Sequence, residues 1–198
     1  MNIVFDLGGV VFNWQPDVII ASVFEDRSTQ DLVRKEIFEH SDWIELDRGA
    51  ISLGSAIDRG ALRTGLPTQD IARLLNAVPG FLTPIEQTIE LIRRLGNTAN
   101  RLFVLSNMQL ASIAHLEQQH DIWELFRGVV ISSRIRKVKP DIEIYRYLLD
   151  QYQLRPSETV FIDDVPENLE AAASLGIRTI RFFDAAQCER ALLDHQGV

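Results

Sequence analysis

The hydrophobic pattern divides this chain into a short strand, a helical block, and a series in which strands and helices alternate. Residues 3–11 form an almost continuous apolar run broken by Asp6, Gly8 and Gly9, which is typical of a buried strand that ends in a turn. From about residue 14 to residue 83, apolar residues recur at helical spacing. The pattern predicts helices over 18–24, 28–38, 41–46, 52–62 and 68–78, separated by Gly49, Gly65 and Pro79-Gly80, with little sign of a strand.

The second half of the chain begins with a helix-start signal. Thr83 as N-cap, Pro84 in the first turn and Glu86 as the partner in a capping box predict a helix that ends at Gly96. The following pattern predicts strands over 102–105, 128–131, 159–162 and 179–182, and helices over 109–119, 141–152, 166–175 and 185–193. This alternation predicts an α/β fold with a parallel sheet covered by helices on both faces. The predicted organisation is a core of residues 1–13 and 84–198, with residues 14–83 inserted after the first strand.

Composition and charge narrow the class of partner. The 198 residues are 46% hydrophobic and 24% charged, which is typical of a globular chain that folds on its own. A formal charge of −8 argues against nucleic acid as a partner, since such binding needs clustered Lys and Arg. The single cysteine, Cys188, excludes an intramolecular disulfide and fits a reducing compartment. Without a basic n-region or a long apolar run, we expect a cytoplasmic protein with no membrane partner.

Polar residues gather where the predicted strands end, which is the edge at which parallel α/β sheets bind ligands. Three of these groups have a simpler alternative: Ser106-Asn107 as the cap of a helix, Lys139 as part of a solvated basic loop, and Asp163-Asp164 as part of a turn. Their common position favours a single site over the three separate alternatives. The residues concerned are Asp6, Ser106-Asn107, Lys139 and Asp163-Asp164.

This combination of side chains suits a divalent metal and a phosphate. Mg²⁺ takes oxygen ligands from carboxylates, waters and a substrate phosphate, and clustered carboxylates repel one another unless a cation lies between them. Lys139 and the Ser106 hydroxyl can bind phosphate oxygens. Asp6 is then the predicted nucleophile, which attacks phosphorus to form an aspartyl-phosphate that water hydrolyses.

With these residues in place, the chain resembles the haloacid dehalogenase-like hydrolase superfamily over nearly its whole length. The matching motifs are Asp6-Leu7-Gly8-Gly9-Val10, Leu105-Ser106-Asn107, Lys139-Pro140 with Glu143-Ile144-Tyr145, and Phe161-Ile162-Asp163-Asp164 with Glu167-Asn168 and Ala171-Ala172. The resemblance implies a Rossmann-like sheet of strand order 3-2-1-4-5 with the insertion as a helical cap. Within the superfamily it looks most like small bacterial sugar-phosphate phosphatases similar to alpha-glucose-1-phosphate phosphatase.

The resemblance also implies roles for individual residues. Asp6 and Lys139 are the expected catalytic residues, and phosphate is expected to bind at Gly8, Ser106, Asn107 and Lys139. The expected Mg²⁺ ligands are Asp6, the carbonyl of Gly8, Asp163 and Asp164, and which of the last two binds the metal directly is left open.

Position 8 departs from the superfamily pattern. Most phosphatases of the superfamily carry there a second aspartate, which protonates the leaving group and then activates water, whereas this chain has Gly8. Such a group contributes about 10²- to 10⁴-fold in rate. Gly8 therefore predicts a slow enzyme, an enzyme that uses another group, or one that prefers phosphates with good leaving groups.

The leading hypothesis is a Mg²⁺-dependent phosphatase of a small phosphorylated metabolite such as a sugar phosphate. The alternatives are a metal-free 2-haloacid dehalogenase, which has no use for an acidic pair, and a non-catalytic binding protein. Substrate and oligomeric state stay open. For Trp14 and Trp43, packing in the protein interior is favoured over the alternative that they line a substrate pocket under the cap. For Asp47 and Arg48, in a loop of the insertion, surface ion pairing is favoured over the alternative that they face the substrate.

Overall fold

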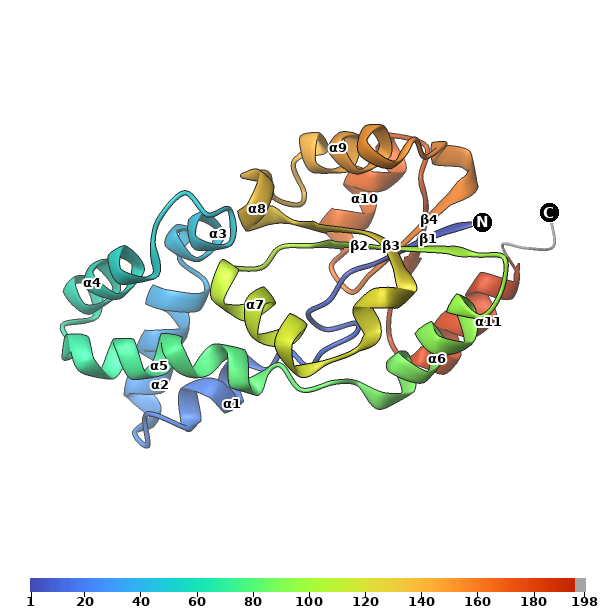
Figure 1. Cartoon of the computed structure of the whole chain (residues 1–198). Coiled ribbons are helices and arrows are strands. Elements are labelled where there is room, and N and C mark those ends of the chain that lie inside the picture. The colour runs from blue at the N-terminus through green and yellow to red at the C-terminus, as the bar shows by residue number, and fades with distance from the viewer. Residues whose placement is uncertain (195–198) are drawn as a thin grey trace.

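A five-stranded parallel sheet lies at the centre of the molecule. A computed structural model of the chain describes residues 1–194; residues 195–198, at the end of the predicted core range, lie outside the described part. The strand order is β3-β2-β1-β4-β5, which confirms the expected order 3-2-1-4-5 (Figure 1). The strands are β1 (Asn2–Phe5), β2 (Arg101–Ser106), β3 (Phe126–Ile131), β4 (Thr159–Asp163) and β5 (Arg178–Arg181). Strand β1 pairs with both β2 and β4, so its end lies at the middle of the sheet.

Helices cover both faces of this sheet. One face carries α6 (Glu86–Gly96), α7 (Leu110–Gln119) and α11 (Ala185–Asp194); the other carries α9 (Ile142–Tyr152) and α10 (Pro166–Ser174) (Figure 1). Side chains alternate along β1, so that Ile3 and Phe5 join the core under the first group while Val4 joins the core under the second. Short turns complete the core: η2 (Ile122–Leu125), α8 (Ser132–Ile135) and η3 (Pro156–Glu158).

The helical block lies at one end of the sheet. It consists of α1 (Pro16–Ala21), α2 (Arg27–Val33), the π-helical turn η1 (Arg34–Phe38), α3 (Ser41–Asp47), α4 (Leu53–Thr64) and α5 (Thr68–Phe81) (Figure 1). These helices enclose a hydrophobic cluster of their own, with Ile19, Ile71 and Leu74 fully buried in it. No described helix is both long and apolar enough to cross a membrane.

Two predicted helix boundaries in this region are wrong. Thr83 and Glu86 do not form a capping box: α6 begins at Glu86 after Ile85, and no side chain caps it. Thr83 instead pairs with Asn13, since the Asn13 N–H donates to the Thr83 carbonyl (2.8 Å) and the Asn13 amide to the Thr83 hydroxyl (3.0 Å). The segments that enter and leave the helical block are thus bonded side by side. Helix α5 also continues through Pro79, because a proline in the last turn removes only one helical hydrogen bond.

Candidate active site

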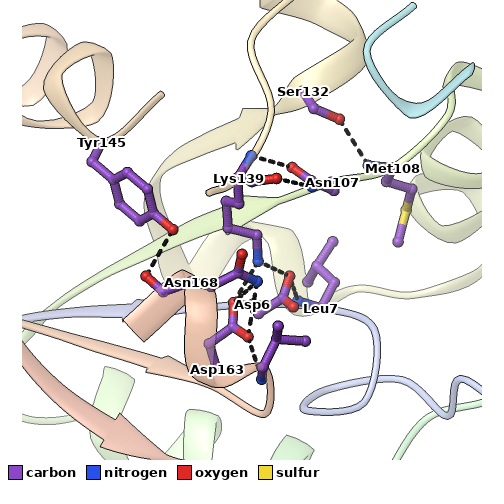
Figure 2. Close-up of polar contacts among 10 residues, drawn as sticks. Asp6, Leu7, Asn107, Met108, Ser132, Lys139, Tyr145, Asp163 and Asn168 are labelled. Atoms are coloured by element: carbon purple, nitrogen blue, oxygen red, sulfur yellow. Dashed lines mark hydrogen bonds and ion pairs between the residues drawn. The ribbon is translucent and has the colours of Figure 1, made fainter. Parts of the chain in front are cut away.

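Three charged side chains meet at the carboxyl edge of the central strands. Asp6 follows β1 and is 7% exposed, and Lys139 reaches it from the loop between α8 and α9. The Lys139 ammonium lies 2.8 Å from Asp6 Oδ1 and 2.6 Å from Asp163 Oδ2 at the end of β4 (Figure 2). Lys139 is only 2% exposed, which excludes the alternative of a solvated basic loop. The predicted strand-end residues therefore do lie together.

The Asp163 carboxylate is held by several donors. The backbone N–H of Val165 donates to Oδ1 (2.8 Å), and the Asn168 side-chain amide lies within 3.1 Å of both oxygens. The Tyr145 hydroxyl in turn donates to the Asn168 carbonyl (2.8 Å; Figure 2). Asp163 is fully buried, so these bonds replace the water that an exposed carboxylate would bind. The bond from Val165, two residues on, is that of a turn, as the alternative had it, and Asn168 in α10 adds further bonds that fix the carboxylate at the site.

Asn107 holds the backbone of Lys139. Its amide donates to the Lys139 carbonyl (2.9 Å) and its side-chain oxygen accepts from the Lys139 N–H (2.8 Å). Helix α7 begins two residues beyond Met108, at Leu110, with no side-chain cap, so the alternative that Ser106 and Asn107 cap this helix is wrong. The side chain of Asn107 positions the lysine, and this leaves its backbone N–H as the group that can face a ligand.

The two glycines after Asp6 have different requirements. Gly9 has φ +78°, a left-handed conformation that strains other residue types, and a Cβ there would lie 2.5 Å from Asp164 Oδ2 and force the Asp164 side chain to shift. A Cβ on Gly8 would instead lie 3.7 Å from the nearest atom of Trp14, which is an ordinary contact. Position 8 therefore has room for a side chain that the sequence does not supply.

Burial and charge shift the titration of these groups. Burial raises the pKa of Asp6, and the attraction of Lys139 opposes this. Burial lowers the pKa of Lys139, but the charges of Asp6 and Asp163 outweigh it and leave this pKa raised. Burial and the neighbouring Asp163 raise the pKa of Asp164. The Ser106 hydroxyl is buried without a hydrogen-bond partner among the described residues, and it lies close enough to Asp6 to lower the pKa of that carboxyl group.

The acidic groups fit a divalent cation. Asp6, Asp163 and Asp164 each offer a carboxylate oxygen, and these atoms lie within 4.8 Å of one another. Lys139 supplies one positive charge against three carboxylates, so the cluster keeps an excess of negative charge. Mg²⁺ binds through one or two carboxylates and keeps positions for water and phosphate. The donor set is therefore suitable for this ion.

A cavity of about 190 Å³ opens beside the acidic cluster, between the core and the helical block. It contains residues that the sequence interpretation did not assign to the site. For Asp47 the favoured interpretation of a surface ion pair is wrong, because this residue is 8% exposed and lines the cavity, as the alternative had it. Arg48 does form the expected ion pairs, with Glu45 and Asp141. Leu46 and Asp47, the last two residues of α3, are both buried because this end of the helix contacts the core. No local sequence pattern predicts this burial. The cavity is lined by Asp6, Gly8, Asn107, Lys139, Asp164 and Asn168, by Trp14, Trp43, Asp47, Val78, Leu82 and Val165, and by Met108, Gln109 and Ser112.

The aromatic and polar walls of this cavity add further information. Trp14 and Trp43 pack together with ring centroids 5.5 Å apart, as predicted, and also face the cavity. Gln109 Nε2 and Ser112 Oγ are buried and have no hydrogen-bond partner among the described residues. Both follow the Asn107 loop, but nothing in the sequence separates them from ordinary helix residues.

Comparisons with known proteins identify the family of this chain. The haloacid dehalogenase-like hydrolase family model matches residues 3–182. Sesquiterpene phosphatase astK from Aspergillus oryzae is 29% identical over 182 residues, which cover 92% of this chain and 89% of that protein. A phosphorylated carbohydrates phosphatase from Thermotoga maritima is 22% identical, with 90% of this chain and 82% of that protein covered. Some relatives are longer than this chain. Drimenol cyclase drtB from Aspergillus calidoustus is 26% identical to it, and the matched region covers 98% of this chain but 36% of that protein.

A solved structure has the same fold. The HAD family enzyme bt-2542 from Bacteroides thetaiotaomicron, in complex with magnesium and inorganic phosphate, superimposes with a TM-score of 0.71 at 23% identity and covers 91% of this chain and 92% of its own. The family match spans nearly all of the described residues and includes every strand of the sheet except for Asn2 at the start of β1. The chain therefore belongs to the haloacid dehalogenase-like hydrolase family.

Proposed function

We propose that this protein is a Mg²⁺-dependent phosphatase that cleaves a small phosphate monoester through an aspartyl-phosphate on Asp6. The observation that carries the proposal is the Lys139 ammonium bound to both Asp6 and Asp163 inside an acidic cluster at a cavity. A fixed cation beside a nucleophilic carboxylate suits a substrate that brings negative charge of its own.

The contacts of Asp6 orient it for attack. The Leu7 N–H (2.7 Å) and the Lys139 ammonium (2.8 Å) both bind Oδ1, which leaves Oδ2 to attack phosphorus. Lys139 would then neutralise the phosphoryl oxygens, while the Ser106 hydroxyl and the backbone N–H of Asn107 bind them from the neighbouring strand end. Water hydrolyses the Asp6 phosphate in the second step.

The metal would be held at the edge of the cavity. Asp6, Asp164 and the backbone of Gly8 all line it, whereas Asp163 is enclosed by Lys139 and Asn168. We therefore assign direct metal binding to Asp6, Gly8 and Asp164, with Asp163 nearby in the acidic cluster and positioning Lys139. When bound, Mg²⁺ supplies positive charge that stabilises the phosphoryl group during transfer.

The substrate class follows from the cavity walls. Residues 14–83 form the predicted cap, and the cavity between cap and core suits a small molecule better than a polymer. The unpartnered Gln109 Nε2 and Ser112 Oγ favour a substrate with hydroxyl groups, because buried polar atoms are rarely left without partners. A sugar phosphate meets this requirement, in line with the carbohydrate phosphatase relative. The indole rings of Trp14 and Trp43 provide an apolar wall, which is the observation in favour of a terpenoid phosphate as the second candidate.

The test is a screen for phosphate release with added Mg²⁺. The panel contains sugar phosphates, a prenyl phosphate and nitrophenyl phosphate, each with the native protein, Asp6→Asn and the control Asp58→Asn. Asp58 is an exposed carboxylate on α4, outside the cavity. We expect metal-dependent hydrolysis that Asp6→Asn abolishes and Asp58→Asn preserves. Undiminished hydrolysis by Asp6→Asn would overturn the assignment.

A further inference from the structure

Asp47 is a buried carboxyl group with no cation beside it. It is the last residue of α3, is 8% exposed, and belongs to no ion pair of the described chain. The backbone N–H of Gln109 and the side chain of Trp43 lie close enough to the carboxyl group to oppose the rise in its pKa that burial causes. A buried ionisable group without a counter-ion is costly, and such groups concentrate at functional sites. Its side chain lines the same cavity as Asp6.

Core contacts fix the position of Asp47. The Ser132 hydroxyl donates to the Asp47 carbonyl (2.5 Å) and also accepts from the Met108 N–H (2.9 Å), so one hydroxyl joins the helical block to the loop after β2. Two residues further, Gly49 has φ +71°, and a Cβ there would lie 2.7 Å from the Ser133 carbonyl oxygen. Glycine lets this loop approach the core, and Asp47 is thereby held at the cavity.

The proposed reaction lacks a proton donor near Asp6. An alkoxide leaves phosphorus slowly unless it is protonated, and Gly8, which lines the cavity, has no side chain to supply the proton. Lys139 is committed to Asp6 and Asp163. We infer that Asp47 is the general acid and base of this phosphatase, an assignment that rests on the proposed function.

The two steps balance with Asp47 in this role. In the first, Asp6 forms a bond to phosphorus, the bond from phosphorus to the ester oxygen breaks, and the Asp47 proton passes to that oxygen to give an alcohol. In the second, a water oxygen bonds to phosphorus, the Asp6–phosphorus bond breaks, and a water proton returns to Asp47. The net reaction is ester plus water to alcohol plus phosphate.

The protonation of Asp47 agrees with this role. Burial raises its pKa to about 7, and the negative charge of Asp6 acts in the same direction while Lys139 opposes it. These two are the charged groups that face Asp47; the nearby cap cations Arg48, Arg59 and Arg63 are bound to Glu45, Asp141 and Asp42. A carboxyl group of this kind can both give and take a proton near neutrality.

The experiment compares leaving groups in Asp47→Asn and the native protein. Asparagine keeps an oxygen that can accept from Gln109 and Trp43 but cannot transfer a proton. We expect kcat/KM for an alkyl phosphate to fall by about 10²- to 10⁴-fold, and that for nitrophenyl phosphate by less than about tenfold, because its leaving group departs without protonation. Rapid mixing of the variant with nitrophenyl phosphate should give a burst of one nitrophenol per site, because hydrolysis of the Asp6 phosphate is slowed.

Controls separate this inference from the proposed function. Asp58→Asn removes an exposed carboxylate of the cap and should leave both substrates unaffected. Equal losses for alkyl and aryl phosphates in Asp47→Asn, or no loss, would overturn the role of Asp47 while the loss of activity in Asp6→Asn still upholds the phosphatase. In the native protein alone, a steep preference for aryl over alkyl phosphates would also overturn it. Failure of the native protein to release phosphate from any ester would overturn the proposed function itself.

Discussion

Replacing Asp47 by asparagine should stabilise the metal-free protein near neutral pH and have little effect in acid. Below about pH 3 the Asp47 side chain is mainly protonated in both the folded and the unfolded chain, so its burial carries no ionisation cost. As the pH rises, the unfolded chain ionises at the ordinary pKa of 3.8, whereas the folded chain keeps the proton until its pKa of about 7. Asp47 therefore lowers the free energy of unfolding of the native protein over this interval, and the asparagine variant lacks this contribution.

The size of the effect follows from the shift in pKa. One pKa unit corresponds to about 1.36 kcal/mol, so a change from 3.8 to about 7 amounts to roughly 4 kcal/mol. The difference in free energy of unfolding between Asp47→Asn and the native protein should grow by roughly this amount from about pH 4 to about pH 8. This is a large share of the stability of an ordinary domain.

Urea unfolding in the presence of a chelator measures this difference directly. Asp42→Asn is a matched control on the same helix: burial raises its pKa, but Arg63 and Arg59 outweigh burial and leave it lowered. Its substitution should therefore destabilise the protein most at neutral pH and least in acid. A difference for Asp47→Asn that stays flat across this range would refute the burial and charge environment described for Asp47.

Three further predictions concern the loops around the cluster. Gly9→Ala should lower the free energy of unfolding in urea by about 1–3 kcal/mol, because the left-handed backbone at this position strains alanine and the added Cβ would meet a carboxylate oxygen of Asp164. Gly8→Ala should be nearly neutral, and equal effects of the two variants would contradict the stated geometry. Asn107→Ala should remove both hydrogen bonds to the Lys139 backbone and lower the free energy of unfolding by about 1–3 kcal/mol. An unchanged melting temperature would contradict this expectation. Adding Gly8→Asp to Asp47→Asn should raise the steady-state rate of alkyl phosphate hydrolysis above that of Asp47→Asn alone. A lower rate in the double variant than in Asp47→Asn would show that position 8 lacks the space for this side chain.

The sheet and the acidic cluster could be predicted because their signals are local. The ends of the paired strands β1 and β4 place Asp6 and Asp163 side by side by topology. Lys139 reaches both from the loop between α8 and α9. The helical spacing of apolar residues after the first strand likewise predicted helices in this part of the chain, and the structure has helices α1 to α5 there. By contrast, the helix start expected at Thr83 was wrong, because its hydroxyl is used by Asn13, a residue distant in sequence.

The positions of Asp47 and Gln109 at the cavity could not be predicted, because tertiary contacts decide them. Asp47 has the composition of a surface loop residue, and its burial depends on a hydrogen bond from Ser132 and on Gly49 packing against Ser133. Gln109 resembles any polar residue at a helix start until the cavity beside it is known. A functional residue in an inserted segment can be recognised only when the packing of that segment against the rest of the chain is known.

The most direct test of the central claim is acid quenching of the native protein during turnover with Mg²⁺, followed by mass spectrometry of the peptide that contains Asp6. The account predicts one phosphoryl group on this peptide, more of it in Asp47→Asn, and none in Asp6→Asn. Steady turnover without phosphorylated Asp6 at any quench time would contradict the account.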